Sequence, residues 1–280
     1  MRYRDPGGDL DWDLKYEKGH CLNSLSTKAF ELNSGTLLDS EASVPKAVKR
    51  VDEIFEKPTF MRNSRGSDVN QGKLGDCGMI AGLTALANVS DGLRRNCVAH
   101  DTNIGIYGFI IYRDGEWIYS IIDDKLYLKS PLENVYRKAY QTGSKAFFLA
   151  HSKDQNETWV PLFEKAFAKA HGDSASLTGG WIGEGTEDLS GGVTAEMFTS
   201  DIIDTDQFWD KEIWRASDEF LFGASTGLLE YGYGERDGIS NGHAYVVMKV
   251  HTLKSGQRLV KLHKSWGMAR KGIWGVGVLE

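Results

Sequence analysis

Two residues six positions apart have the types and spacing needed for nucleophilic chemistry. Cys77 follows Asp76, a capping residue type, at the start of an apolar run. In the first turn of a helix, unpaired N–H groups and the helix dipole stabilise a thiolate. Gln71 can donate its side-chain amide to an oxyanion, with the Cys77 N–H as the second donor. This pattern predicts the nucleophile half of a thiol hydrolase, with Gly72 and Gly75 allowing the tight turn between the two donors.

The matching base would be a histidine that is distant in sequence and adjacent in space. His243 begins an apolar strand pattern directly after Gly242, so we expect its ring at a strand end beside a cleft. His263 lies on a second strand pattern and is the second choice. The remaining histidines lie at polar boundaries, where they ordinarily titrate and solvate: His20, His100, His151, His171 and His251.

Helices are predicted on both sides of the first strands. The apolar run Cys77–Val89 indicates a buried helix with Asp76 as its N-cap. Glu157–Ala170 has the spacing of an amphipathic helix, with Asn156 as the candidate cap. The glycine-dense segment from 179 to 192 is predicted to be a loop, since glycine disfavours regular helices.

Strand patterns frame these helices. Ile106–Arg113 and Glu116–Ile122 are joined by Asp114-Gly115, the two-residue signature of a type I′ hairpin. Further strands are predicted at His243–His251, Arg258–His263 and Ile273–Val278. Helices followed by a strand-rich end indicate the α+β class. We expect an N-terminal arm at 1–45, a first lobe at 46–177 that carries Cys77, and a β-rich second lobe at 178–280 that carries His243.

Composition narrows the possible partners. Among 280 residues, 33 Lys and Arg face 39 Asp and Glu, and the net charge of −6 disfavours nucleic acid or an anionic membrane surface. No stretch approaches the roughly 18 apolar residues of a membrane span. Three cysteines are too few for a disulfide framework. These features predict a cytoplasmic protein with free thiols.

Several motifs in order resemble one family. The segment from Gln71 to Cys77 resembles the calpain active-site signature, and Gly242-His243-Ala244-Tyr245 resembles the family's segment around its catalytic histidine. Further matches are Thr186–Val193, which resembles the Glu-Asp-x-x-Gly-Gly-Val loop, and Phe163–Lys169, Asp123–Leu126 and Ser265-Trp266-Gly267. The resemblance runs from about Phe55 to Trp274 and implies a papain-like cysteine protease fold, with a cleft between a helical and a β-rich lobe.

The resemblance also implies roles for the site residues. Cys77 would attack the scissile carbonyl of a protein or peptide substrate, and Gln71 with the Cys77 amide would form the oxyanion hole. His243 would accept and return the proton, while Trp266 would shield the histidine's partner. The glycines Gly75 and Gly242 would line the cleft. A regulatory partner is not identified by any of these motifs.

Calcium is the regulator that the resemblance implies. Asp68 occupies a position similar to a carboxylate ligand of the family's first-lobe site, and Glu133 is a candidate second ligand; hard oxygen donors suit this ion. Met268-Ala269-Arg270 replaces acidic residues of the second-lobe site, so calcium is expected in the first lobe only. The end at Glu280 precedes some of the family's terminal β structure, which predicts a shortened second lobe.

Two positions depart from the calpain pattern. Lys264 stands where the family has an asparagine that orients the histidine, and an ammonium offers no acceptor. At about 5 Å and an effective dielectric near 20, the two cations would repel by roughly 3 kcal/mol, about two units of histidine pKa. Asn241, Asp237 or a backbone carbonyl could replace the missing acceptor. Gly78 replaces a tryptophan, which is expected to widen the cleft or loosen the helix start.

Three functions follow from these residues. The leading hypothesis is an intracellular calpain-like cysteine endopeptidase that acts through a Cys77 acyl-enzyme. The alternative is a catalytically inactive homologue that serves as a binding or regulatory module, motivated by Lys264 and Gly78. A third interpretation is another Cys-His acyl transferase, such as a transglutaminase-like enzyme.

Overall fold

The computed structural model describes residues 45, 47–62, 64–129, 142–172, 174–216, 219–227, 235–236 and 239–266. Most of the predicted arm at 1–45 and the strand predicted at Ile273–Val278 lie outside these ranges. So do the predicted ligand Glu133, the candidate acceptor Asp237, Gly267 and the segment Met268–Arg270.

Helices and antiparallel strands are mixed, as the α+β prediction requires. The helices are α3 Val51–Ile54, α4 Cys77–Ala87, α5 Trp159–Ala170, α6 Ile182–Ser190 and α7 Thr205–Lys211. The strands are β1 Ala47–Arg50, β2 Val69–Asn70, β3 Cys97–Asp101, β4 Ile106–Arg113, β5 Glu116–Asp123, β6 Lys125–Leu128, β7 His151–Ser152, β8 Gly223–Ser225, β9 Glu235–Arg236, β10 Ile239–Ser240, β11 Ala244–Thr252 and β12 Arg258–Lys264. Within the described ranges, no helix has both the length and the apolar character needed to cross a bilayer.

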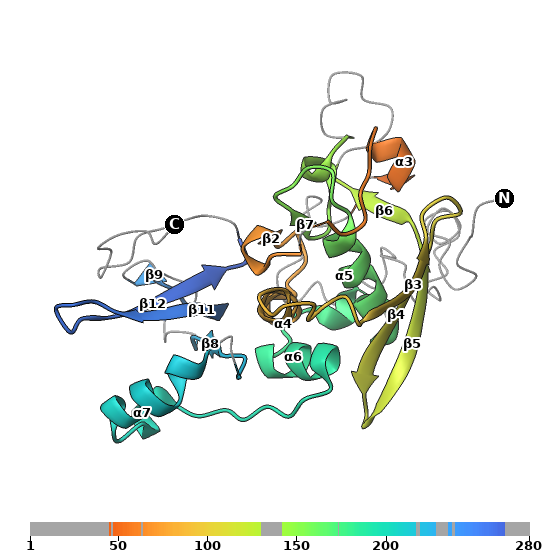
Figure 1. Cartoon of the computed structure of the whole chain (residues 1–280). Helices are drawn as coiled ribbons and strands as arrows, with labels where there is room; N and C mark the ends of the chain where they lie inside the picture. Colours follow the sequence, from red (N-terminus) through yellow and green to blue (C-terminus); the bar gives the residue numbers. More distant parts are fainter. Residues whose placement is uncertain are drawn as a thin grey trace.

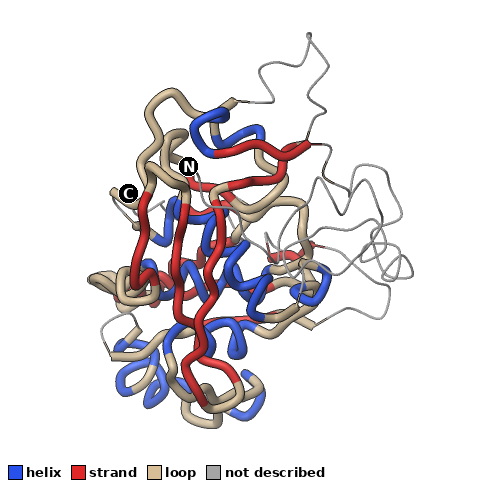
Figure 2. The backbone as a smooth tube through the Cα atoms, turned by 90° about the vertical axis from the view of Figure 1, so that its right-hand side faces the viewer, coloured by secondary structure: helices blue, strands red, loops and turns tan. Residues whose placement is uncertain are grey.

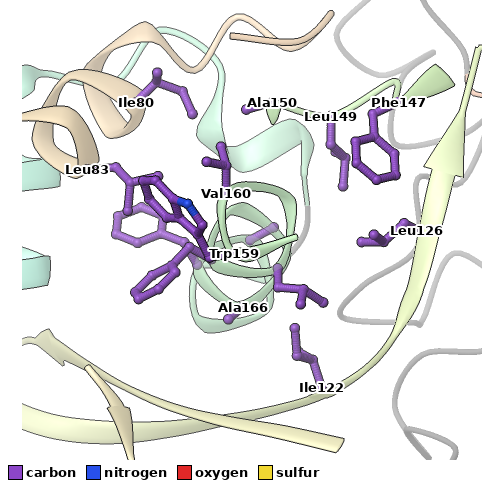
Figure 3. Close-up of a cluster of buried hydrophobic side chains, with 14 of the residues drawn as sticks. Ile80, Leu83, Ile122, Leu126, Phe147, Leu149, Ala150, Trp159, Val160 and Ala166 are labelled. Carbon is purple, nitrogen blue, oxygen red and sulfur yellow. The ribbon is translucent and has the colours of Figure 1, made fainter. Parts of the chain in front are cut away.

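Helix α4 lies in the middle of the molecule and is buried along its length after Cys77 (Figure 1). Its large side chains Ile80 and Leu83 belong to the main core, together with Trp159 of α5 (Figure 3). Its small side chains Ala81 and Ala85 pack in a second cluster against β11. The predicted buried helix is confirmed, and two different core surfaces meet on it.

A three-stranded sheet, in the order β3-β4-β5, packs on α5 (Figures 1 and 2). The predicted hairpin is confirmed: β4 and β5 pair from Ile106 opposite Asp123 to Arg113 opposite Glu116. Asp114 and Gly115 have φ of 52° and 87°, the positive values that a type I′ turn requires.

Helix α5 confirms the second helix prediction with a shifted start. Its N-cap is Thr158, so the candidate cap Asn156 is wrong. Its Lys165 is buried and forms an ion pair with Asp123 at 2.5 Å. Asp124, the next residue, pairs with Arg50 of β1. The paired acidic residues of the Asp123–Leu126 motif therefore join strands and helices of the core.

The loop predicted from 179 to 192 is wrong, because most of this segment forms α6. Each glycine costs a helix about 1 kcal/mol relative to alanine, but packing against α4 outweighs that cost. A Cβ at Gly185 would lie 2.8 Å from the Gly78 carbonyl oxygen, so the two helix backbones touch. Leu189 is buried in the main core, and Gly191 ends the helix with a φ of 68°.

The effect expected of Gly78 is also corrected. A Cβ at this position would lie 2.3 Å from the Gly180 carbonyl oxygen and 2.8 Å from the Trp181 carbonyl carbon. Backbone of the α6 approach therefore fills the space beside Gly78. The missing tryptophan leaves neither a wider cleft nor a loosened helix start at this point.

A second sheet holds the other end of the described chain. Its order is β12-β11-β8, and β11 pairs with β12 from Tyr245 opposite Lys264 to Thr252 opposite Arg258. The strands predicted at His243–His251 and Arg258–His263 are thus confirmed: both ends of the first and the end of the second are shifted by one residue. Contacts between β11 and α4 join this sheet to the helical part (Figure 1).

The glycine contact between α4 and α6 predicts a stability effect. In a Gly82→Ala variant, the new Cβ would lie 2.6 Å from the Gly185 carbonyl carbon. Overpacking of this kind costs about 1–3 kcal/mol and exceeds the helix-propensity gain, so we expect a net loss of about 1–2 kcal/mol in the free energy of unfolding. Urea unfolding followed by circular dichroism measures it.

Gly180→Ala is the matched control, because its Cβ would meet no atom closer than 3.9 Å. We expect its unfolding free energy to stay near that of the parent. Equal losses in the two variants would contradict the close helix contact.

Candidate active site

Cys77 is the first residue of α4, and its side chain packs beside Ala244 at the start of β11. Burial raises the pKa of the Cys77 thiol, and the negative charge of Asp76 raises it further. The backbone N–H groups of Ala244 and Gly78 act in the opposite direction. The thiolate-stabilising effect expected at a helix N-terminus is therefore present but smaller than the effect of burial.

His243 directly precedes β11 and is 4% exposed. Ala244, the residue after His243, contacts Cys77, so the chain segments that carry the predicted nucleophile and base meet where α4 packs against β11. Burial, and secondarily the charge of Lys264, lowers the pKa of His243 to about 4. The ring therefore has its neutral form at pH 7, and its buried Nε2 has no hydrogen-bond partner among the residues that the structure describes.

Lys264 and Trp266 lie next to the His243 ring. The Trp266 ring centroid lies 4.6 Å from that of His243, and the Lys264 Nζ lies 4.5 Å from the Trp266 centroid. The ammonium also donates to the Ser240 hydroxyl at 2.5 Å. Lys264 is thus held at the site rather than directed away from it. Asn241 does not replace the missing acceptor, because His243 Nε2 has no hydrogen-bond partner among the described residues.

The side-chain amide of Gln71 is held by hydrogen bonds within its own turn. Its Nε2 donates to the Leu74 carbonyl at 2.8 Å and to Asp76 Oδ1 at 3.2 Å. Its Oε1 accepts from the Ser265 hydroxyl at 2.9 Å. Both amide hydrogens have acceptors, so in this arrangement the side chain does not offer a free donor for an oxyanion.

Each glycine of the site meets a different structural requirement. A Cβ at Gly72 would lie 2.4 Å from the Phe148 carbonyl oxygen, so this turn needs the close approach that glycine allows. The Gly75 carbonyl accepts from the Gly179 N–H at 3.1 Å. Gly242, just before the histidine, has a φ of 60°.

The second-choice histidine lies away from the thiol. His263 Nε2 contacts the Val69 carbonyl oxygen at 3.1 Å, on the β2 side of β12. Sequence reasoning missed a different group: His171, Glu184 and Asp188 have ligand atoms within 4.8 Å of one another. His171 Nε2 contacts Asp188 Oδ2 at 2.8 Å and its Nδ1 contacts the Phe167 carbonyl, which ties the end of α5 to α6. Only the proximity of the two helices reveals this group.

The surroundings of Asp68 do not complete a metal site. Its side chain accepts from the Ser67 hydroxyl at 3.4 Å, and its carbonyl accepts from the Lys153 N–H at 2.8 Å. The Lys153 ammonium donates to the Ser67 carbonyl at 2.5 Å. Calcium takes six to eight oxygen ligands. Among the described residues, a single carboxylate beside an ammonium does not fit that requirement.

A thiol at a helix N-terminus, with a histidine just before a separate strand that packs against that helix, has the residue types of thiol-dependent acyl-transfer enzymes. A family model described as calpain family cysteine protease matches residues 27–278. The chain belongs to this family of proteases, which are hydrolases.

Individual relatives agree with the family match. Calpain-9 of Mus musculus is 33% identical over 273 residues, which cover 91% of this chain and 37% of the relative. The calpain-1 catalytic subunit of Sus scrofa is 31% identical over 295 residues, covering 97% and 39%. A calpain-type cysteine protease of Oryza sativa subsp. japonica is 31% identical over 236 residues, covering 81% and 10%. The chain spans about two fifths or less of the length of these relatives.

The electrostatic role of Lys264 is open to direct measurement. Replacing Lys264 by Met keeps most of the side-chain length and removes the charge. We expect the pKa of His243 to rise from about 4 but to stay below 6.5, because burial, the larger cause, remains. A proton NMR titration of the imidazole ring follows this change.

Lys249→Met, at an exposed position of β11, is the control and should leave the His243 titration unchanged. An unaltered His243 pKa in the Lys264→Met protein would contradict the assignment.

Proposed function

We propose that this chain is the protease core of a cysteine endopeptidase, with Cys77 as nucleophile and His243 as general base. The observation that carries the proposal is the contact of Cys77 with Ala244, the residue after His243. This contact supports a thiol at the start of α4 and an imidazole just before β11 that act together at the interface between helix and sheet. The family membership of the chain supports protein or peptide substrates.

The proposed reaction balances through one proton and one thioester. The Cys77 thiol gives its proton to His243 while the sulfur attacks the peptide carbonyl carbon. The tetrahedral intermediate collapses, the C–N bond breaks, and His243 returns the proton to the leaving amine. Water, deprotonated by the same imidazole, then hydrolyses the thioester and frees Cys77.

In the resting form, the Cys77 thiol and the His243 imidazole are both uncharged. Burial holds the pKa of His243 near 4 and raises that of Cys77, so thiol and imidazole carry no charge at pH 7. Gln71 must also release Leu74 or Asp76 before its amide can turn to an oxyanion. We therefore propose that substrate or a regulator rearranges the Gln71 turn before the first step.

We propose that the mixed fold of helices and strands is a papain-like architecture of two lobes. The packing of α6 on α4 supports a lobe boundary beyond Ser190, since the core of the first lobe includes Leu189. The boundary predicted at 178 would separate two helices whose backbones touch. We propose the exposed stretch after Gly191 as the connection between the lobes.

One observation favours the alternative function, a catalytically silent binding or regulatory module. The Nε2 atom of His243 is buried without a partner, as loss of an asparagine acceptor would leave it, and Lys264 adds a positive charge nearby. An unoriented imidazole that resists protonation is a poor base for a thiol whose own pKa is raised.

Calcium dependence and a cytoplasmic location remain predictions. Asp68 would supply one hard oxygen ligand to calcium, and further ligands would have to come from residues outside its described surroundings. The roles given to Trp266, Gly242 and Gly75 as cleft residues are part of the same proposal.

The nucleophile is tested with an irreversible peptide epoxide directed at thiols. We expect mass spectrometry to find the adduct on Cys77 and not on Cys97, whose pKa burial raises to about 11. The Cys77→Ser protein is the control and should remain unlabelled. A folded protein whose Cys77 stays unmodified both with and without calcium would refute the endopeptidase proposal.

Lys264→Asn separates the two candidate functions. The amide supplies an acceptor to Nε2 and removes the neighbouring charge, so we expect hydrolysis of a fluorogenic peptide to rise by roughly tenfold or more. Lys264→Met removes the charge without adding an acceptor and should give a smaller gain. No gain in either protein, with an unreactive Cys77, would favour the binding module.

A further inference from the structure

Beneath Cys77 lies a pair of carboxyl groups that the proposed reaction does not use. Asp76, the N-cap of α4, and Glu164, in the middle of α5, are both 0% exposed. Asp76 Oδ1 accepts from the Gln71 amide at 3.2 Å, and Glu164 Oε2 accepts from the Ala150 N–H at 2.6 Å. The other two oxygens, Asp76 Oδ2 and Glu164 Oε1, are buried, and no group among the described residues donates a hydrogen bond to either of them.

The carboxyl groups of Asp76 and Glu164 lie close enough to each other for a side-chain hydrogen bond. Two carboxylates have no proton to donate to such a bond. The contact therefore exists only when one of the two groups is protonated. Burial raises the pKa of Asp76 to about 6, and burial together with the Asp76 charge raises that of Glu164 well above its ordinary value.

The surroundings of the pair contain no compensating cation. Among the described residues, the groups that interact with it are Gln71, the Ala150 N–H and the Cys77 thiol, and none is a lysine, arginine or histidine. Glu157 is another buried carboxylate, but both of its oxygens accept hydrogen bonds. It accepts from the Arg62 N–H at 2.9 Å, the Ser152 hydroxyl at 3.2 Å and the Trp159 indole at 3.0 Å.

We propose that Glu164 is a positioning residue for Cys77: it shares one proton with Asp76, and this hydrogen bond fixes the N-terminus of α4 to α5. The shared proton itself does not depend on any catalytic activity of the chain. Its consequence for the nucleophile rests on the proposed function, because only then does the position of Cys77 affect a reaction.

The proton also limits the charge beside the thiol. With it, the pair carries one negative charge; without it, two carboxylates would face each other in a buried space. Since the charge of Asp76 already raises the pKa of Cys77, a second charge would disfavour the thiolate further. The arrangement thus serves both the geometry and the reactivity of Cys77.

Isosteric amides test the shared proton. In Glu164→Gln, the oxygen can accept from Ala150 and the NH₂ can donate to Asp76, which reproduces the protonated acid. We expect its melting temperature to lie within about 3 °C of the parent at pH 6.5. Glu157→Gln is the matched control: in either orientation its NH₂ would face an N–H donor, that of Arg62 or that of Trp159, so we expect a fall of about 5 °C. Equal falls in the two variants would overturn the proposal.

The double variant gives the sharper result. Asp76→Asn alone keeps the contact, because its NH₂ donates to Glu164 while its oxygen accepts from Gln71. In Asp76→Asn with Glu164→Gln, two NH₂ groups face each other, and a flip of either amide only moves the clash to Gln71 or Ala150. We expect the melting temperature to fall about 5 °C below the sum of the single effects. Additive effects would contradict a shared proton.

A pH series isolates the proton itself. The pKa of Glu164 is raised on folding, so the parent loses stability as pH rises toward that value, while Glu164→Gln has no such proton to keep. As pH rises from 6.5 toward the raised pKa of Glu164, we expect the variant to gain about 4 °C per pH unit relative to the parent. A constant difference over this range would overturn the proposal.

The rate at which Cys77 is modified tests whether Glu164 positions the thiol. We expect the peptide epoxide to modify Cys77 in Glu164→Gln at a rate within about twofold of the parent, and in Glu164→Ala at least tenfold more slowly. Equal rates in all three proteins would show that Glu164 does not position the thiol. If the parent itself is not labelled, the proposed function fails, and the melting series still decides the shared proton.

Discussion

The start of helix α4 is fixed by contacts that approach it from three elements. From α5 comes the carboxyl pair of Asp76 and Glu164, from α6 the backbone contact at Gly78, and from β11 the packing of Ala244. Each contact needs a close approach or full burial, and so tolerates little change in side-chain volume. The position of Cys77, and with it the place where helical part and sheet meet, depends on this one helix end.

The electrostatics of the site follow from the same burial. A half-buried thiol resists losing its proton, a buried imidazole resists gaining one, and a buried acid pair retains one between two carboxyl groups. Lys264 adds to this bias, because its ammonium is bound to Ser240 and Trp266 next to the histidine. Under the proposed function, this is a neutral resting state in which the Gln71 amide is engaged by Leu74 and Asp76, and a change in the Gln71 turn would be the first step away from it.

Local patterns in the sequence predicted the elements whose residues face one environment. The apolar run after Cys77, the Asp114-Gly115 hairpin and the strand after His243 were all found at nearly their observed bounds. Motif resemblance located the cysteine and the histidine as one site before any distance was known. Helix α6 was missed because its stability comes from glycine contacts with α4, which local propensity does not contain. The pairing of Asp76 with Glu164 was missed for the same reason: it joins two helices across 88 positions, and either carboxylate alone resembles an ordinary polar residue.

The central claim is that α4 and β11 hold the Cys77 thiol beside the His243 ring. A bifunctional alkylating reagent with a three-carbon spacer tests it directly, since it reacts first with a thiol and then with a nucleophile a few ångströms away. The account predicts that peptide mapping of the folded protein finds a covalent bridge from Cys77 to His243, and that the bridge disappears after unfolding in urea. A folded protein in which Cys77 is alkylated once and never linked to His243 would contradict it.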